Sequence, residues 1–334
     1  MKIAIWGAGG IGCYYGAKLQ TAGHEVVFIA RGKHLTAMQS EGLSVSHPEF
    51  SFHETVCAID QDELLEHYLC QQFDLIILAL KNTHTASLLE AASEWLKQGE
   101  TPVLSLQNGV DNEPEIAQCI GEERTLGGLA VRIGGHIIEP GCVEATGIAQ
   151  VIFGAWPNHR NNAEQSENQK QGDSTEIRDN SAQLKSVNTF NEMFQQAGIA
   201  SILTDDIQRE LWRKLIINNG VNPLSALSGL DTRSLTQNPV LRDKVYSMML
   251  ETAAAAEHDG LILERTDVDE MFELICNFDA IKTSMLVDKE KGRPLELDGI
   301  SGTVLRRCQQ LGIEAPVTAF VHEILSLEEE RRHG

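Results

Sequence analysis

The chain opens with Lys2-Ile-Ala-Ile-Trp6-Gly7-Ala8-Gly9-Gly10-Ile11-Gly12, an apolar run followed directly by a glycine-rich turn. The apolar run is typical of a strand buried on both faces of a parallel sheet. The turn fits the pattern G-x-G-x-x-G, and a helical pattern follows it as far as Ala22. In that context the helix N-terminus presents free N–H groups to an anion. We therefore expect the phosphates of a dinucleotide to bind at Gly7, Ala8, Gly9, Gly10, Ile11 and Gly12.

The end of the second predicted strand, Glu25–Ala30, indicates which dinucleotide binds. An NAD site usually has Asp or Glu there to hold the ribose 2′-hydroxyl, whereas an NADP site has Arg nearby. No carboxylate lies between Glu25 and Glu41, and the strand is followed by Arg31 and then Lys33. Arg31 can hold a 2′-phosphate through two hydrogen bonds, so the sequence favours NADPH. The alternative is a solvated arginine at a strand end.

Strands and helices alternate over the first 150 residues. Asp74–Leu80 and Pro102–Leu106 are further apolar runs, with a helical pattern at Thr83–Lys97 between them. This alternation predicts a parallel sheet with helices on both sides. Three strand-like segments expected to pair antiparallel come next, at Thr125–Ile133, His136–Ala145 and Ala149–Phe153.

The pattern changes in the second half of the chain. The polar stretch from Pro157 to about Lys185 predicts a solvent-exposed insertion or a mobile loop, and Ile199–Leu203 predicts one last strand. Helical apolar spacing follows, at Glu210–Asn219, Val240–His258, Asp267–Phe278, Gly299–Gln310 and Ala315–Leu327. The expected fold is an α/β Rossmann-type domain, residues 1–204, followed by an all-α domain, residues 205–334.

Composition excludes several classes of protein. The 334 residues include 27 Lys and Arg against 48 Asp and Glu, a net charge of −21, which argues against binding to nucleic acid or to an anionic membrane surface. No apolar run approaches the about 18 residues of a membrane helix, and no signal-peptide pattern is seen. The seven cysteines form no C-x-x-C pair, which is typical of the reducing cytoplasm, and no spacing predicts a bound metal.

Two more predicted strands end in polar residues. Lys81 follows one of them, and Gln107-Asn108-Gly109 follows the other. Because ligands of open α/β sheets bind beyond the carboxyl ends of the strands, Lys81 and Asn108 are candidate ligand contacts. A solvent-facing lysine and a plain turn are equally compatible with the pattern.

The second half of the chain carries a lysine that is a candidate proton donor. Lys214, Asn218 and Asn222 have the i, i+4 and i+8 spacing of one helix face. Asparagine is unfavourable inside a helix, so two of them aligned with a lysine suggest a polar cleft in which the ammonium acts as general acid. The alternative is a solvated lysine with helix-terminal asparagines near Pro223. Ser284 and Glu296 could add a hydroxyl and a carboxylate, or could be a helix-surface serine and a helix cap.

Taken together, these motifs resemble the ketopantoate reductase (2-dehydropantoate 2-reductase) family, within the class with a 6-phosphogluconate-dehydrogenase-like C-terminal domain. The resemblance covers nearly the whole chain. It is carried by the glycine turn, Arg31, Lys81, Gln107-Asn108-Gly109, Trp212-Arg213-Lys214 with Asn218 and Asn222, Ser284-Met285 with Asp288, and the pair Glu296 and Asp298.

The resemblance implies that NADPH reduces ketopantoate to pantoate, on the route to pantothenate and coenzyme A. Lys214 would polarise the carbonyl oxygen and protonate the forming alkoxide. Asn108, Asn218 and Asn222 would hold substrate and cofactor. Ser284 would bind the substrate carboxylate, and Glu296 would accept a hydrogen bond from the substrate hydroxyl and contact the cofactor.

The chain departs from the family pattern in its long polar stretch and at Ser301-Gly302, where Asn-Gly is common. The substrate could therefore be another 2-oxo acid, and a non-enzymatic dinucleotide sensor is a third, less favoured hypothesis. We expect a small 2-oxo acid partner and a monomer or homodimer in the cytoplasm.

Overall fold

The computed structural model describes residues 1–157 and 181–333. The chain divides into two compact units. The first comprises Met1–Gln107 and Asn112–Gln208, and the second comprises Asn108–Asp111 and Arg209–Gly334. The sequence pattern does not predict that the short segment Asn108–Asp111 groups with the helices.

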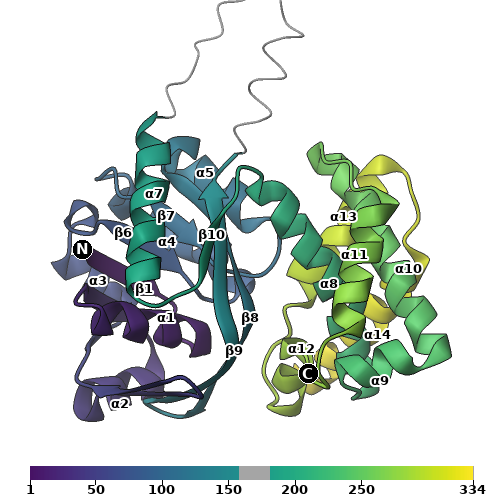
Figure 1. The fold of residues 1–334 in the computed structure, drawn as a ribbon, viewed down its shortest axis with the longest axis horizontal. Helices are drawn as coiled ribbons and strands as arrows, with labels where there is room; N and C mark the ends of the chain where they lie inside the picture. The colour runs from purple at the N-terminus through teal and green to yellow at the C-terminus, as the bar shows by residue number, and fades with distance from the viewer. Residues whose placement is uncertain (158–180, 334) are drawn as a thin grey trace, which may run out of the picture. The chain divides into compact units, whose positions relative to one another are not determined.

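The first unit is built on one mixed sheet (Figure 1). Its strand order is β4-β3-β9-β8-β7-β6-β1-β2-β5, with β10 paired to β9. The parallel part consists of β1 (Lys2–Trp6), β2 (Glu25–Ile29), β5 (Cys57–Ile59), β6 (Leu75–Leu78) and β7 (Val103–Ser105). Since β1 lies between β6 and β2, the segments that follow these three strands leave the same edge of the sheet side by side.

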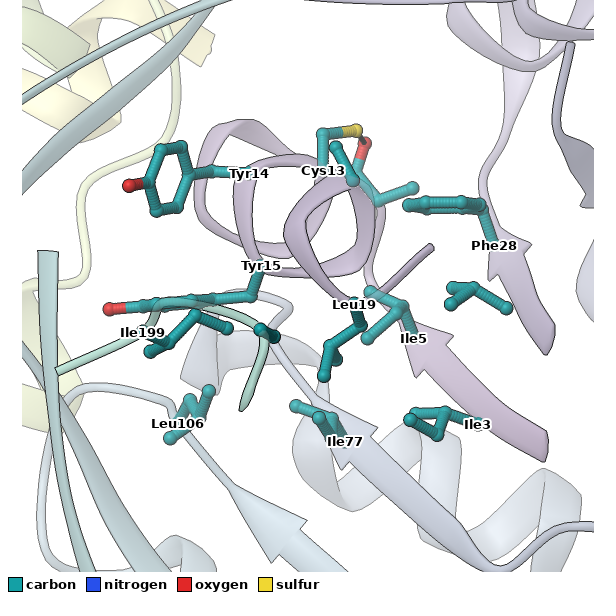
Figure 2. Packing of buried hydrophobic residues seen from close by; sticks show 14 of the residues in the cluster. Ile3, Ile5, Cys13, Tyr14, Tyr15, Leu19, Phe28, Ile77, Leu106 and Ile199 are labelled. Atoms are coloured by element: carbon teal, nitrogen blue, oxygen red, sulfur yellow. Dashed lines mark hydrogen bonds between the residues drawn. The ribbon is translucent and has the colours of Figure 1, made fainter. Parts of the chain in front are cut away.

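Side chains of β1 alternate between two buried apolar clusters. Ile3 and Ile5 belong to one cluster, and Ala4 and Trp6 belong to the other. Figure 2 shows Ile3 and Ile5 in the first cluster, which also contains Tyr15. A strand with both faces covered must be apolar at every position, and burying each large side chain contributes about 1.5–3 kcal/mol.

The helices of this unit connect its strands. They are α1 (Gly10–Thr21), α2 (Gly32–Glu41), α3 (Gln61–His67), α4 (Thr85–Leu96), α5 (Asn112–Ile120) and α7 (Ser181–Gln196). The sequence predicts an exposed insertion at residues 157–185. Residues 158–180 of this stretch lie outside the described part of the chain, and α7 begins at Ser181.

The expectation of three antiparallel strands after residue 125 was wrong. Two long strands, β8 (Thr125–Glu139) and β9 (Cys142–Ala155), form one hairpin instead. A register shift between Val131 and Ile133 bends the hairpin, and the glycines within both strands made the pattern look interrupted. The strands β3 (Leu43–His47) and β4 (Phe50–Glu54) were not predicted, whereas the expected last strand is β10 (Ser201–Leu203).

The second unit is helical. Its α-helices are α8 (Ile207–Ser228), α9 (Thr232–Gln237), α10 (Pro239–Ala255), α11 (Arg265–Cys276), α12 (Ser284–Glu290), α13 (Thr303–Leu311) and α14 (Pro316–His333). A short π-helical turn, η5 (Asp298–Gly302), leads into α13. The expected fold class, a Rossmann-type domain followed by an all-α domain, is confirmed. Among the residues described, no helix is both long and apolar enough to cross a membrane.

Candidate active site

The glycine-rich turn joins β1 to α1. Gly7 has φ +107°, a conformation that L side chains rarely adopt, and Ala8 N–H donates to the carbonyl of Ile29 on β2. A Cβ on Gly9 would meet nothing within 4 Å, so the space beside this residue is open. Gly9 is the N-cap of α1 and has no side chain to satisfy the first N–H groups of the helix. Open space beside unsatisfied donors fits a pyrophosphate group.

The first turn of α1 also lies directly against β8. A Cβ on Gly10 would overlap the backbone of Gly135, and a Cβ on Gly135 would lie 2.8 Å from the carbonyl carbon of Gly10. The hairpin thus forms one wall of the glycine turn. The signal for this contact was Gly134-Gly135 within a strand, a pattern that often marks close backbone approach.

Cationic side chains flank the turn. Nη2 of Arg31, the N-cap of α2, lies 3.3 Å from Nε2 of His84, which immediately precedes α4. Lys81, which follows β6 after a gap of two residues, is the N-cap of the short turn that ends in His84. Burial, followed by the charges of Arg31 and Lys81, lowers the pKa of His84 below its ordinary value. The sequence pattern predicted Arg31 and Lys81 as candidate cofactor contacts, and the structure adds His84 beside them.

His34 holds the Arg31-bearing segment in place. Its Nδ1 accepts a hydrogen bond from Gly141 N–H at 3.0 Å, and its Nε2 lies 3.6 Å from Cys13 Sγ on α1. Because Nδ1 accepts, the ring is neutral with its proton on Nε2. Burial lowers the pKa of His34, in agreement with that state.

A buried hydrogen-bond chain fixes the end of β7. Gln107 Nε2 donates to Thr85 Oγ1 at 2.8 Å, and that hydroxyl donates to Asn112 Oδ1 at 2.8 Å. Gly109 follows with φ +99°. Asn108 therefore lies between two anchored positions, in a tight turn.

The lysine row of the second unit lies on α8. Lys214 and Asn218 are half-buried, and Asn222 is only 5% exposed. The alternative of helix-terminal asparagines is wrong, because α8 continues through Pro223 to Ser228. Asn222 is thus an interior helix residue, where a polar side chain is unfavourable without a specific role.

Asn108 and Glu296 come together in this unit. Asn108 Nδ2 donates to Glu296 Oε2 at 3.2 Å, although the two residues are 188 positions apart. Glu296 is 9% exposed, and a buried carboxylate requires hydrogen-bond donors. Asp111 holds the same segment to α13, since it accepts from Thr303 Oγ1 at 2.6 Å and pairs with Arg307 at 2.5 Å.

Ser284 is the exposed first residue of α12. The hydroxyl that caps this helix belongs to Thr283, which accepts from Leu286 N–H. The Ser284 hydroxyl is therefore not the helix cap. Within residues 1–157 and 181–333, no group of three or more His, Cys, Asp or Glu side chains could hold a metal ion.

A glycine-rich turn at the edge of a parallel sheet, in a chain that continues as a helical unit, is typical of dinucleotide-dependent oxidoreductases. The chain belongs to the ketopantoate reductase family: residues 3–158 match Ketopantoate reductase PanE/ApbA, and residues 206–329 match its C-terminal part. Members of this family are NAD(P)-dependent oxidoreductases that reduce small 2-oxo acids.

Individual relatives agree with this assignment over the full length. A 2-dehydropantoate 2-reductase of Mesorhizobium japonicum is 30% identical, with 98% of this chain and 96% of the relative covered. The crystal structure of a 2-dehydropantoate 2-reductase from Geobacter metallireducens has a TM-score of 0.82 at 30% identity and covers 98% of this chain and 100% of its own. D-mandelate dehydrogenase, in a ternary structure with NADH and anilino(oxo)acetate, has the same fold, with a TM-score of 0.84 at 23% identity and coverage of 100% and 99%.

Proposed function

We propose that this protein is a cytoplasmic enzyme that reduces 2-dehydropantoate to pantoate with NADPH, a step towards pantothenate and coenzyme A. The observation that carries the proposal is the buried carboxylate of Glu296, held by Asn108 in the unit that also contains Lys214. 2-Dehydropantoate carries a hydroxyl group in addition to its oxo and carboxylate groups. A buried carboxylate that accepts hydrogen bonds favours a substrate that brings a donor over an analogue that lacks one.

Each polar group of the second unit has a role in this proposal. Lys214 donates a hydrogen bond to the carbonyl oxygen and then transfers its proton to the alkoxide. Asn218 and Asn222 orient the substrate from the same helix, and Ser284 binds its carboxylate. Asn108 keeps Glu296 turned towards the substrate hydroxyl, and both residues also contact the cofactor.

The first unit supplies the proposed NADPH site. The backbone N–H groups at Gly10 and Ile11, in the first turn of α1, bind the pyrophosphate, while Arg31 and Lys81 bind the 2′-phosphate. No acidic residue follows β2 to hold a free 2′-hydroxyl, which supports NADPH over NADH. The bound reduced nicotinamide supplies the hydride that reaches C2 of the oxo acid.

The direct test uses two substrates that differ by one hydroxyl group. We expect kcat/KM for 2-dehydropantoate to exceed that for 3,3-dimethyl-2-oxobutanoate by about tenfold or more in the wild type, and by much less in Glu296→Gln. Equal rates for both substrates in the wild type would contradict the assignment of 2-dehydropantoate. Arylglyoxylates belong in the same panel, because D-mandelate dehydrogenase has this fold.

The role of Lys214 is tested separately. Lys214→Ala removes the proton donor, so we expect kcat to fall about 10²–10⁴-fold, whereas Lys244→Ala, at an exposed lysine of α10, retains full activity. Retention of activity in Lys214→Ala would show that another group donates the proton. Binding of NADPH without turnover of any oxo acid would instead favour a dinucleotide sensor.

A further inference from the structure

His84 faces Arg31 at the edge of the sheet where β2 and β6 end, on either side of the glycine turn that follows β1. The contact between Arg31 Nη2 and His84 Nε2 measures 3.3 Å. A guanidinium can only donate hydrogen bonds, so Nε2 accepts and the ring proton is on Nδ1. His84 is therefore a neutral imidazole in the protein without ligand.

The charged groups around the ring are cationic. Arg31 acts on His84 from the turn between β2 and α2, and Lys81 acts from the segment after β6. From α4, the Ser87 hydroxyl donates to the main-chain carbonyl of His84 and leaves its ring unaffected. A second positive charge on the imidazole would face two cations, so protonation requires an anion to be present.

We propose that His84 is a proton-dependent specificity residue, which takes up a proton when a phosphate monoester on the ribose 2′ oxygen binds beside Arg31. The inference rests on the proposed function, in which the cofactor is NADPH. One proton passes from water to Nε2, and the resulting N–H donates to a phosphate oxygen that Arg31 also contacts. Three cations, Arg31, Lys81 and protonated His84, then surround the dianion.

Proton uptake makes cofactor selectivity depend on pH. The pKa of His84 is lowered in the free protein and is raised beside the phosphate, so affinity for the 2′-phosphate is fully developed below the free-state pKa. It declines as pH rises through the pKa of the complex, by at most about tenfold per pH unit for one proton. A dinucleotide with a free 2′-hydroxyl lacks the dianion and shows no such decline.

The experiment compares 2′,5′-ADP, whose second phosphate is on the ribose 2′ oxygen, with 5′-ADP, whose second phosphate is attached to the 5′-phosphate and which has a free 2′-hydroxyl. Isothermal titration calorimetry at pH 6.5 to 8.5, in buffers with different ionisation enthalpies, measures both affinity and proton uptake. His84→Gln retains an acceptor for Arg31 but does not titrate. His67→Gln changes an exposed histidine at the end of α3 and is the matched control.

In the wild type and in His67→Gln, we expect the ratio of the two affinities to fall about three- to tenfold from pH 6.5 to 8.5, with net proton uptake on binding 2′,5′-ADP. In His84→Gln the ratio is flat above pH 7, where the phosphate is fully ionised, and uptake is lost. Tight binding of 2′,5′-ADP with equal proton uptake in wild type and His84→Gln overturns the role of His84 and leaves the NADPH preference intact. Failure to prefer 2′,5′-ADP at any pH overturns both.

Discussion

Gly135 and Gly10 touch through their backbones, so a single methyl group at Gly135 tests how the glycine turn is held. An added Cβ would lie 2.8 Å from the carbonyl carbon of Gly10, which forces β8 or the first turn of α1 to shift. The N–H groups at that turn are the proposed pyrophosphate donors. We therefore expect Gly135→Ala to raise the Kd for NADPH about tenfold, a loss of about 1.4 kcal/mol, measured by cofactor fluorescence.

Gly134→Ala is the control for this prediction. Gly134 is the neighbouring residue of the same strand, but its Cβ would meet only Thr146 Oγ1, at 3.3 Å. Neither glycine has a positive φ, so the two variants differ in contact and not in backbone strain. We expect Gly134→Ala to bind NADPH within about twofold of the wild type. An equal loss of NADPH affinity in the two variants would show that the substitutions weaken β8 in general, and would contradict a specific role for the contact between Gly135 and Gly10.

Individual residues of the site differ in how far sequence reveals them. Arg31 and Lys81 could be predicted as candidates because each follows the end of a predicted strand, where ligands of open α/β sheets bind. His84 has no such mark, and only the strand order β6-β1-β2 brings it to Arg31. The contact between Asn108 and Glu296 spans 188 positions, and no local pattern encodes a pairing of that range.

At the scale of elements, a buried carboxylate joins α8 to α11. Asp267, with a side chain 5% exposed, pairs with Arg209 at 2.6 Å and with Arg213 at 2.7 Å. Removing its charge takes from the two guanidinium groups the buried carboxylate that they share. Breaking a fully buried pair costs about 3–5 kcal/mol, and Arg209 is 35% exposed, so we expect Asp267→Asn to lower the free energy of unfolding by about 2 kcal/mol in urea titrations.

Glu270→Gln is the matched control, because Glu270 pairs with the same Arg213, at 2.8 Å, but has a side chain 64% exposed. Exposed pairs contribute about 0–1 kcal/mol, so this variant should unfold close to the wild type. A loss in Glu270→Gln as large as that in Asp267→Asn would contradict the argument from burial.

Helix α8 also shows where a local pattern fails to predict an element. The apolar spacing predicted a helix at Glu210–Asn219. Pro223 lacks the N–H that would bond to the carbonyl of Asn219, and a proline at such a position usually ends a helix. The structure continues the helix to Ser228, with Val221 and Leu224 buried on either side of the proline. Tertiary burial outweighs local propensity here, and that burial cannot be read from the local sequence.

At the scale of the whole molecule, the net charge does not determine whether a local site can bind an anion. The net charge of −21 disfavours polyanionic partners in general. Binding of a phosphate nevertheless depends mainly on groups within a Debye length of about 8 Å at physiological salt, and Arg31, Lys81 and His84 lie close to one another at the proposed site. A strongly acidic protein can therefore bind a dinucleotide at a local cationic site.

Acidification acts on the whole molecule through its half-buried histidines. Burial is the largest cause that lowers the pKa of His24, His34, His84 and His322. Their contribution to stability is complete above the unfolded-state pKa of about 6.5, because below it the unfolded chain binds more protons than the native state. It is then lost as pH falls through the native-state pKa values, by at most about 1.4 kcal/mol per pH unit for one histidine and by less where solvent screens a half-exposed ring.

In contrast, lowering the pH towards the pI of about 4.9 stabilises the fold, because it reduces the repulsion between the excess carboxylates. Salt screens that repulsion but leaves the buried groups largely unaffected. In roughly 0.5 M NaCl we therefore expect Tm, measured by calorimetry, to fall from pH 6.5 to 5.5. His34→Gln should flatten this decline because it removes one titrating ring, whereas His67→Gln should not. A Tm that rises on acidification in high salt would mean that charge repulsion, and not histidine burial, governs the pH dependence of this fold.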